Sequence, residues 1–113
     1  MLYLYNMSSE SESDKVFKAL AAPLRRRILD ALKDEPRTTG DLCARFASVD
    51  RCTVMQHLKV LEEAGLVVAR REGRERWNHL DAMPIKRIHD RWIGPYAARA
   101  ADMLGRLKDD LER

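Results

Sequence analysis

The sequence predicts a mainly α-helical fold with a small β-hairpin, built from about five helices and two strands. Apolar residues recur at helical spacing over most of the chain, which favours helices. One stretch, VDRCTVMQHLKVLEEAGLVVARREGRERWNHL, begins as an amphipathic helix and continues directly into two strand-like runs. A long apolar stripe then follows to the C-terminus. These patterns, in a chain of 113 residues, indicate one domain.

The composition is that of a globular protein. Hydrophobic residues make up 45% of the chain and charged residues 35%, which argues against disorder. No apolar run is long enough to cross a bilayer. The formal net charge is +3, and positive charge is concentrated in the segment RREGRER. Cys43 and Cys52 occur without a secretion-signal pattern, so we expect reduced thiols in the cytoplasm.

The N-terminal third of the chain predicts a tail followed by two helices. Residues 1–13 include the polar run MSSESES and are expected to form a flexible tail, while residues 14–113 form the domain. Met7 is an alternative first residue. Pro23 is favoured at the start of the second helix, because its missing N–H group costs nothing there. The apolar faces of these two helices consist of Val16, Phe17, Leu20, Leu24, Ile28, Leu29 and Leu32.

The next two segments predict a helix-turn-helix. Thr38 or Thr39 can cap the helix GDLCARFA, because a threonine oxygen accepts from the free N–H groups of a first helical turn. Asp50 can cap the following helix in the same way, and Gly65 can end it in the left-handed conformation. In such a pair the second helix is the one that enters the DNA major groove. Its inward face is expected to contain Val54, His57, Leu58 and Leu61.

The segment LVVARREGRERWNHL predicts a β-hairpin with its turn at Glu72-Gly73-Arg74. A helix with a polar outer face, followed at once by an arginine-rich hairpin, is typical of a recognition helix and its wing. Each feature alone is more often a solvated surface than a DNA contact. Together they predict the following DNA-binding residues: Arg51, Cys52, Thr53, Met55, Gln56, His57, Lys59, Arg71, Arg74 and Arg76.

These side chains are expected to divide the work of DNA recognition. Gln56 can pair bidentately with an adenine edge, and Arg74, at the hairpin tip, can reach a minor groove or the backbone. Arg71 and Arg76 are expected to hold phosphates, which positions the protein without reading sequence. Glu62 and its neighbour Glu63 are expected to point away from the phosphates. His57 lies partly inward, where it can form a core hydrogen bond or contact a phosphate.

The C-terminal segment predicts a long helix that a second copy of the chain covers. Asp81 can cap this helix, Pro84 is tolerated in its first turn, and Gly94-Pro95 should kink or break it. Its apolar stripe exceeds what so small a domain can cover, which predicts a homodimer. The alternative is a helix that folds back wholly onto its own subunit. The expected dimer interface comprises Val16, Phe17, Leu20, Ile88, Trp92, Tyr96, Ala100, Met103, Leu104, Leu107 and Leu111.

Taken together, LAAPLRRRILDAL, TVMQHLKVLEEAGLV and RREGRERWNHL resemble the ArsR-type winged helix-turn-helix repressors. The resemblance covers about Phe17 to Leu80, and the TVxxHLxxLxxAGLV pattern is its specific part. It implies a small, dimeric bacterial transcription repressor. It also implies that the first and last helices form the dimer, and that the fourth helix and the wing contact double-stranded operator DNA.

The chain departs from the metal-sensing members of that family. Thr38 and Gly40 stand where those members carry a Cys-x-Cys pair, and His89 with Asp90 lacks a second histidine downstream. A metal site needs three or four ligands in a fixed geometry, so neither a metal site nor any other cofactor is expected. The resemblance therefore points to the branch without the Cys-x-Cys site, and the sequence identifies no small-molecule effector.

Other functions remain as alternatives at this point. No catalytic triad, phosphate-binding glycine loop or carboxylate pair is present in the sequence, which argues against an enzyme. A winged-helix domain can also serve protein–protein contacts, but an apolar wing tip would suit that role better than an arginine-rich one. A third alternative is the same repressor with a thiol or metal switch.

Overall fold

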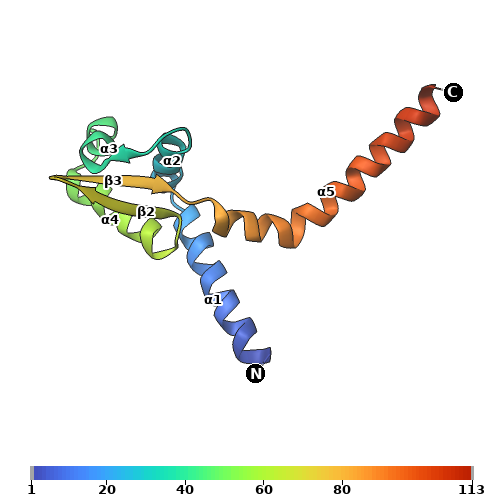
Figure 1. Cartoon of the computed structure of the whole chain (residues 1–113), viewed down its shortest axis with the longest axis horizontal. Coiled ribbons are helices and arrows are strands. Elements are labelled where there is room, and N and C mark those ends of the chain that lie inside the picture. The colour runs from blue at the N-terminus through green and yellow to red at the C-terminus, as the bar shows by residue number, and fades with distance from the viewer. Residues whose placement is uncertain (1, 113) are drawn as a thin grey trace.

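The computed structural model describes the backbone of residues 2–112 and the side chains of residues 10–112. Three short helices and a small antiparallel sheet form a compact body, from which the first and last helices extend in different directions (Figure 1). The elements in chain order are α1 (Leu2–Leu20), α2 (Pro23–Leu32), β1 (Arg37–Thr38), α3 (Thr39–Arg45), α4 (Arg51–Glu63), β2 (Val67–Glu72), β3 (Glu75–Leu80) and α5 (Met83–Glu112).

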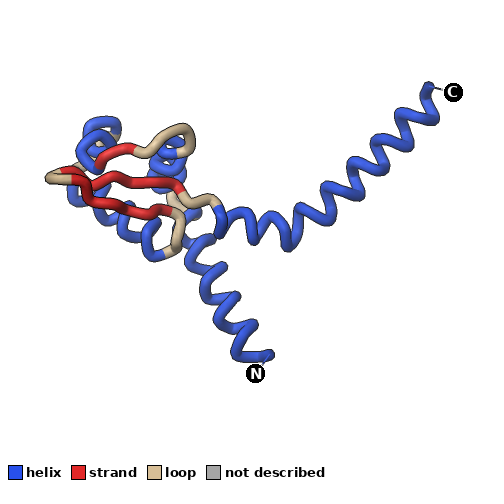
Figure 2. Tube along the Cα trace, viewed as in Figure 1, coloured by secondary structure: helices blue, strands red, loops and turns tan. Residues whose placement is uncertain are grey.

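The sheet has three strands in the order β1-β3-β2, one more than the two-stranded wing that the sequence predicts (Figure 2). Arg37 of β1 pairs with Asn78 of β3. Asn78 is fully buried, and its Nδ2 donates to the carbonyl oxygen of Arg37 at 3.2 Å and to Oγ1 of Thr39 at 3.1 Å. The short strand β1 was missed because two residues carry no alternating apolar pattern. Its pairing ties the start of α3 to the hairpin.

The core lies between the helices and one face of the sheet. Leu42 of α3 is fully buried there, and Thr38 is the cap of that helix, since its Oγ1 accepts from the backbone N–H of Asp41 at 3.0 Å. Pro23 begins α2 as expected, and Ala22 before it provides no side-chain cap. The buried apolar residues are Val16, Ala19, Ile28, Leu29, Leu32, Leu42, Val54, Leu58, Leu61, Leu66 and Val67.

The first helix is longer than the sequence predicts. It begins at Leu2, whereas the sequence places its start near Asp14, so the polar run MSSESES is helical. The described part of segment 1–13 is therefore helical, and its expected flexibility stays a prediction. Among the α1 side chains that the structure describes, from residue 10 on, Val16 and Ala19 near the C-terminal end are buried in the core.

Arg25 of α2 joins the end of α1 to α4. Its guanidinium donates to the carbonyl oxygens of Ala19 at 2.8 Å and Lys18 at 3.0 Å, and so binds two carbonyls of the last turn of α1. Its Nη1 also lies 3.0 Å from Nδ1 of His57. A guanidinium can only donate, so His57 accepts through Nδ1 and is the neutral, Nε2-protonated tautomer.

The last helix, α5, runs without interruption from Met83 to Glu112 and contains Pro95. The sequence predicts a kink or a break near Pro95; the helix is not broken, and it changes direction partway along its length (Figure 1). Oδ1 of Asp81 accepts from the N–H of Met83 at 3.0 Å, but the carbonyl of Ala82 accepts the first helical bond, so Asp81 lies one residue before the cap position that the sequence assigns to it. None of the side chains of α5 is fully buried, which rules out the alternative in which it folds back wholly onto its own subunit.

No helix in the described part of the chain combines the length and the apolar character that crossing a membrane requires.

Acidification should weaken the fold through His57. Burial, and then the charge of Arg25, lower the pKa of His57 below its ordinary value of 6.5. Below about pH 6.5 the unfolded chain therefore binds the proton first, and the free energy of unfolding falls until the lowered pKa is reached. Urea unfolding should give a lower free energy of unfolding at about pH 5.5 than at about pH 7.5. His57→Gln should reduce this difference, because glutamine does not titrate and can still accept from Arg25. His89→Gln, on the exposed surface of α5, serves as the control. An equal loss in wild type and His57→Gln would contradict this account.

Candidate nucleic-acid interface

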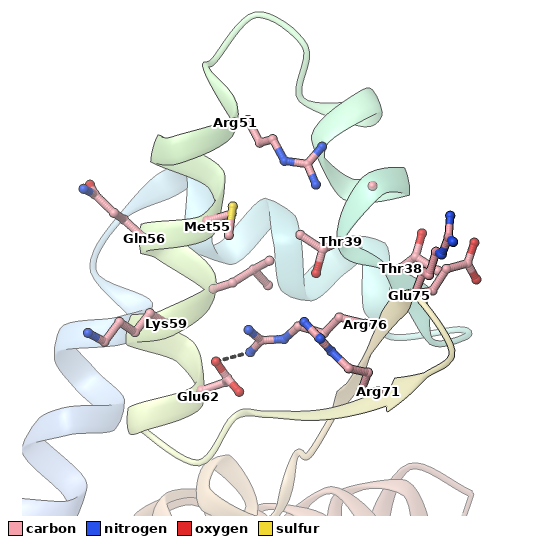
Figure 3. Close-up of a pocket in the computed structure, with 13 residues that line it drawn as sticks. Thr38, Thr39, Arg51, Met55, Gln56, Lys59, Glu62, Arg71, Glu75 and Arg76 are labelled. Carbon is pink, nitrogen blue, oxygen red and sulfur yellow. Dashed lines mark ion pairs between the residues drawn. The ribbon is translucent and has the colours of Figure 1, made fainter.

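A groove of about 690 Å³ lies between the outer face of α4, the start of α3 and the hairpin formed by β2 and β3 (Figure 3). Basic side chains project into it from both the helix and the hairpin. The residues that line it are Thr38, Thr39, Gly40, Arg51, Met55, Gln56, Leu58, Lys59, Glu62, Arg71, Arg74, Glu75 and Arg76.

The helix side of the groove is built on a well-anchored α4. Val54, Leu58 and Leu61 are buried on its inner face. The Asp50 side chain accepts from the N–H of Thr53 at 2.7 Å, and hydrogen bonds from Thr53 lower the pKa of Asp50. The helix ends before Gly65, which has a φ of +78°. These contacts fix the position of α4, and its exposed residues Arg51, Met55, Gln56 and Lys59 line the groove.

The hairpin side of the groove follows from the strand register. Val67 pairs with Leu80, Ala69 with Asn78 and Arg71 with Arg76, and side chains of directly paired residues lie on the same face. This face therefore changes from apolar at the base of the hairpin to a pair of arginines near its tip. Gly73, with a φ of +63°, and Arg74 form the two-residue connection. The turn lies where the sequence predicts it.

One contact crosses the groove. Nη2 of Arg76 forms an ion pair with Oε2 of Glu62 on α4 (Figure 3). One expectation from the sequence is thereby corrected, because Glu62 points into the groove rather than away from it. Arg76 has an ion-pair partner within the chain, and its expected contact with phosphate stays a prediction. The sequence spacing could not reveal this pair, because it joins a helix to a strand across a long-range contact.

The groove brings together seven of the residues predicted to contact DNA and leaves out Cys52, Thr53 and His57. Cys52 is exposed but does not line the groove, and Thr53 is half-buried at the capped end of α4. His57 is half-buried against Arg25, which makes the core hydrogen bond the better of its two expected roles. The sequence did not reveal the contribution of Thr38 at the end of β1 and of Thr39 and Gly40 at the start of α3, which also line the groove.

In the part of the chain that the structure describes, no group of three or more His, Cys, Asp or Glu residues is arranged to hold a metal ion. Cys43 is half-buried and Cys52 is exposed, and both are free thiols.

Comparison with known proteins places this architecture in a family. A helix-turn-helix domain family model matches residues 20–70. The HTH-type transcriptional regulator YuzN of Bacillus subtilis is 37% identical over 86 residues, which cover 71% of this chain and 94% of YuzN. The transcriptional repressor SdpR of Bacillus subtilis is 37% identical over 60 residues, which cover 53% of this chain and 66% of SdpR.

A solved structure shares the fold. An ArsR-like transcriptional regulator from Rhodococcus sp. RHA1 superposes with a TM-score of 0.69 at 25% identity, over 94% of this chain and 95% of that chain. Its similarity extends over the full arrangement of helices and hairpin, beyond the helix-turn-helix alone. The chain belongs to the ArsR-type winged helix-turn-helix family of DNA-binding transcriptional regulators.

Proposed function

We propose that the chain is a homodimeric, cytoplasmic repressor that binds operator DNA through the groove between α4 and the hairpin. In this arrangement α4 enters the major groove, and the wing, β2 and β3, lies against the adjacent backbone. The observation that carries the proposal is the set of basic side chains that converge on the groove from two elements (Figure 3). The similarity to the repressor SdpR supports repression as the outcome of binding.

The charge of the groove suits a nucleic-acid backbone. Five basic residues line it against two acidic ones, Glu62 and Glu75. Arg51 projects from the start of α4 toward the wing, and Arg71 and Arg76 project from the facing strands, so a phosphate strand lying in the groove would meet cations on both sides (Figure 3). Neutralising phosphates releases condensed counterions, and this release supplies most of the sequence-independent affinity.

The two sides of the groove are suited to different tasks. Gln56 is exposed on α4, and its amide can both donate to and accept from an adenine edge. Arg71 and Arg74 lie on the hairpin, where a guanidinium can bind phosphate whatever the sequence. Base preference should therefore come from α4 and salt-dependent affinity largely from the wing.

The surface of α5 supports the homodimer. A compact monomer of this mass exposes about 6,400 Å², whereas this chain exposes 8786 Å². The excess is larger than the roughly 800 Å² that each partner covers in a standard interface. The large apolar side chains exposed on α1 and α5 are Phe17, Met83, Trp92, Ile93, Tyr96, Met103, Leu104, Leu107 and Leu111.

Three residues of the dimer interface expected from the sequence are better placed in the core of their own chain. Val16 is buried in the core of its own chain, and Leu20 and Ile88 pack partly against the same core. These side chains therefore have little surface left to offer a partner. The interface we propose is centred on Phe17, whose ring centroid lies 6.1 Å from that of Trp92, and on the exposed stripe of α5.

The proposal as a whole is tested by a gel shift with the promoter upstream of the chain's own coding region. A shifted band that random DNA does not compete away supports operator binding. Promoter and random DNA that compete equally would argue against a specific operator at that place.

We expect Gln56→Ala and Arg71→Ala to have different effects on DNA binding. Gln56→Ala should weaken an operator selected from randomised duplexes by about 1–3 kcal/mol and relax preference at one base pair. Arg71→Ala should weaken all sequences alike and flatten the slope of log affinity against log salt by about 0.9 per protomer. Fluorescence anisotropy over a salt series measures both. The division of work is wrong if Arg71→Ala changes base preference without changing the salt slope.

Replacing both Met103 and Leu107 by Glu should yield monomers and abolish operator binding. Each glutamate would place a charge within the apolar stripe, where a partner helix would have to desolvate it. Sedimentation at micromolar concentration measures the oligomeric state. Replacing Arg99 and Arg106 of the same helix by Glu changes charge without removing apolar surface and should leave dimers. A monomeric wild type would refute the dimer.

A further inference from the structure

Glu62 occupies an unusual place for an acidic residue in a groove suited to phosphate. It lies on α4 one turn beyond Lys59 and lines the groove beside the arginines of the wing (Figure 3). Its carboxylate pairs with Arg76, and the two side chains remain 31% and 36% exposed. The pair is therefore open to solvent, and an incoming anion can reach it.

The strand register explains why an anion is favoured at this position. Arg76 lies directly opposite Arg71, so two guanidiniums share the end of the inner hairpin face. Like charges that face each other across paired strands destabilise a hairpin. In the free protein, Glu62 supplies the negative charge that reduces this repulsion. In a DNA complex, a backbone phosphate is the group of matching charge and geometry.

We propose that Glu62 is a built-in competitor for the DNA backbone, which must displace it from Arg76 when the wing engages a duplex. The inference rests on the proposed groove, and it adds a residue that lowers affinity for DNA of any sequence. Glu62 acts through Arg76 and need not touch DNA itself. Its effect should therefore disappear when Arg76 is absent.

The competition predicts a defined salt effect. Whenever Glu62 keeps Arg76, that guanidinium neutralises no phosphate, and one phosphate fewer releases its condensed counterion. A glutamine at this position leaves Arg76 free for phosphate. Glu62→Gln should therefore bind tighter and give a steeper dependence of affinity on salt, by up to about 0.9 per protomer.

The experiment uses the full chain and a fluorescent duplex of random sequence, so no operator is needed. Anisotropy titrations across a salt series compare wild type with Glu62→Gln, and circular dichroism checks that each variant is folded. Because an exposed ion pair contributes about 0.2–1 kcal/mol, we expect affinity to rise by up to about fivefold per protomer. Glu63→Gln is the matched control, since Glu63 is exposed and lies outside the groove.

Four further variants separate the outcomes. The gain in affinity should require Arg76. The double variant Glu62→Gln/Arg76→Gln should therefore bind no more tightly than Arg76→Gln alone. If Glu62→Gln equals Glu63→Gln, or binds more weakly than wild type, the competition is refuted while the groove stands. Lys59→Gln and Arg71→Gln test the groove itself, because affinity that neither variant changes would refute the proposed DNA-facing surface and this inference with it.

Discussion

The burial of one face of α4 is the constraint on which the rest of the structure depends. Val54, Leu58 and Leu61 pack into the core at helical spacing, so the opposite face must point to solvent in a single orientation. The same core receives Leu66 and Val67, which bring the hairpin back beside the helix directly after Gly65. A helix and a wing held by one apolar cluster leave a groove between them whose shape is set by packing rather than by the polar residues that line it.

Near the tip of the hairpin, its inner face has two paired arginines, one of which forms an ion pair with a carboxylate from α4. Every second residue of β2 and β3 lies on the inner face of the hairpin, and this face continues past the core. Its paired positions there need not be apolar, and they are Arg71 and Arg76. Two guanidiniums so close would repel each other. The Glu62 carboxylate offsets part of this repulsion, at the expense of charge available to DNA. Stability of the free wing and affinity for phosphate are therefore opposed at the same residues.

Local signals allowed much of this architecture to be predicted. The cap at Asp50, the end of α4 at Gly65 and the turn at Gly73 each depend on a few adjacent residues, and all were confirmed. What the sequence did not reveal depends on contacts between distant segments. Strand β1 exists because Arg37 meets Asn78, and Glu62 lies in the groove because Arg76 is across from it. The early start of α1 was also missed, because serine and glutamate runs carry no apolar periodicity.

The position of Phe17 against Trp92 links the compact body, which carries the groove, to the proposed dimer. This contact lies where α1 leaves the core, two residues from the buried Ala19, and near the proximal part of α5. Arg25 holds the carbonyl of Ala19 on one side and His57 of α4 on the other. Phe17 and Ala19 of α1, with Arg25 of α2, therefore lie between Trp92 of α5 and His57 of α4. In a two-fold dimer the separation of the two α4 helices must match one turn of DNA, about 34 Å. By the two-fold symmetry, a small displacement at Phe17 and Trp92 would occur in both protomers and would shift both α4 helices relative to their half-sites.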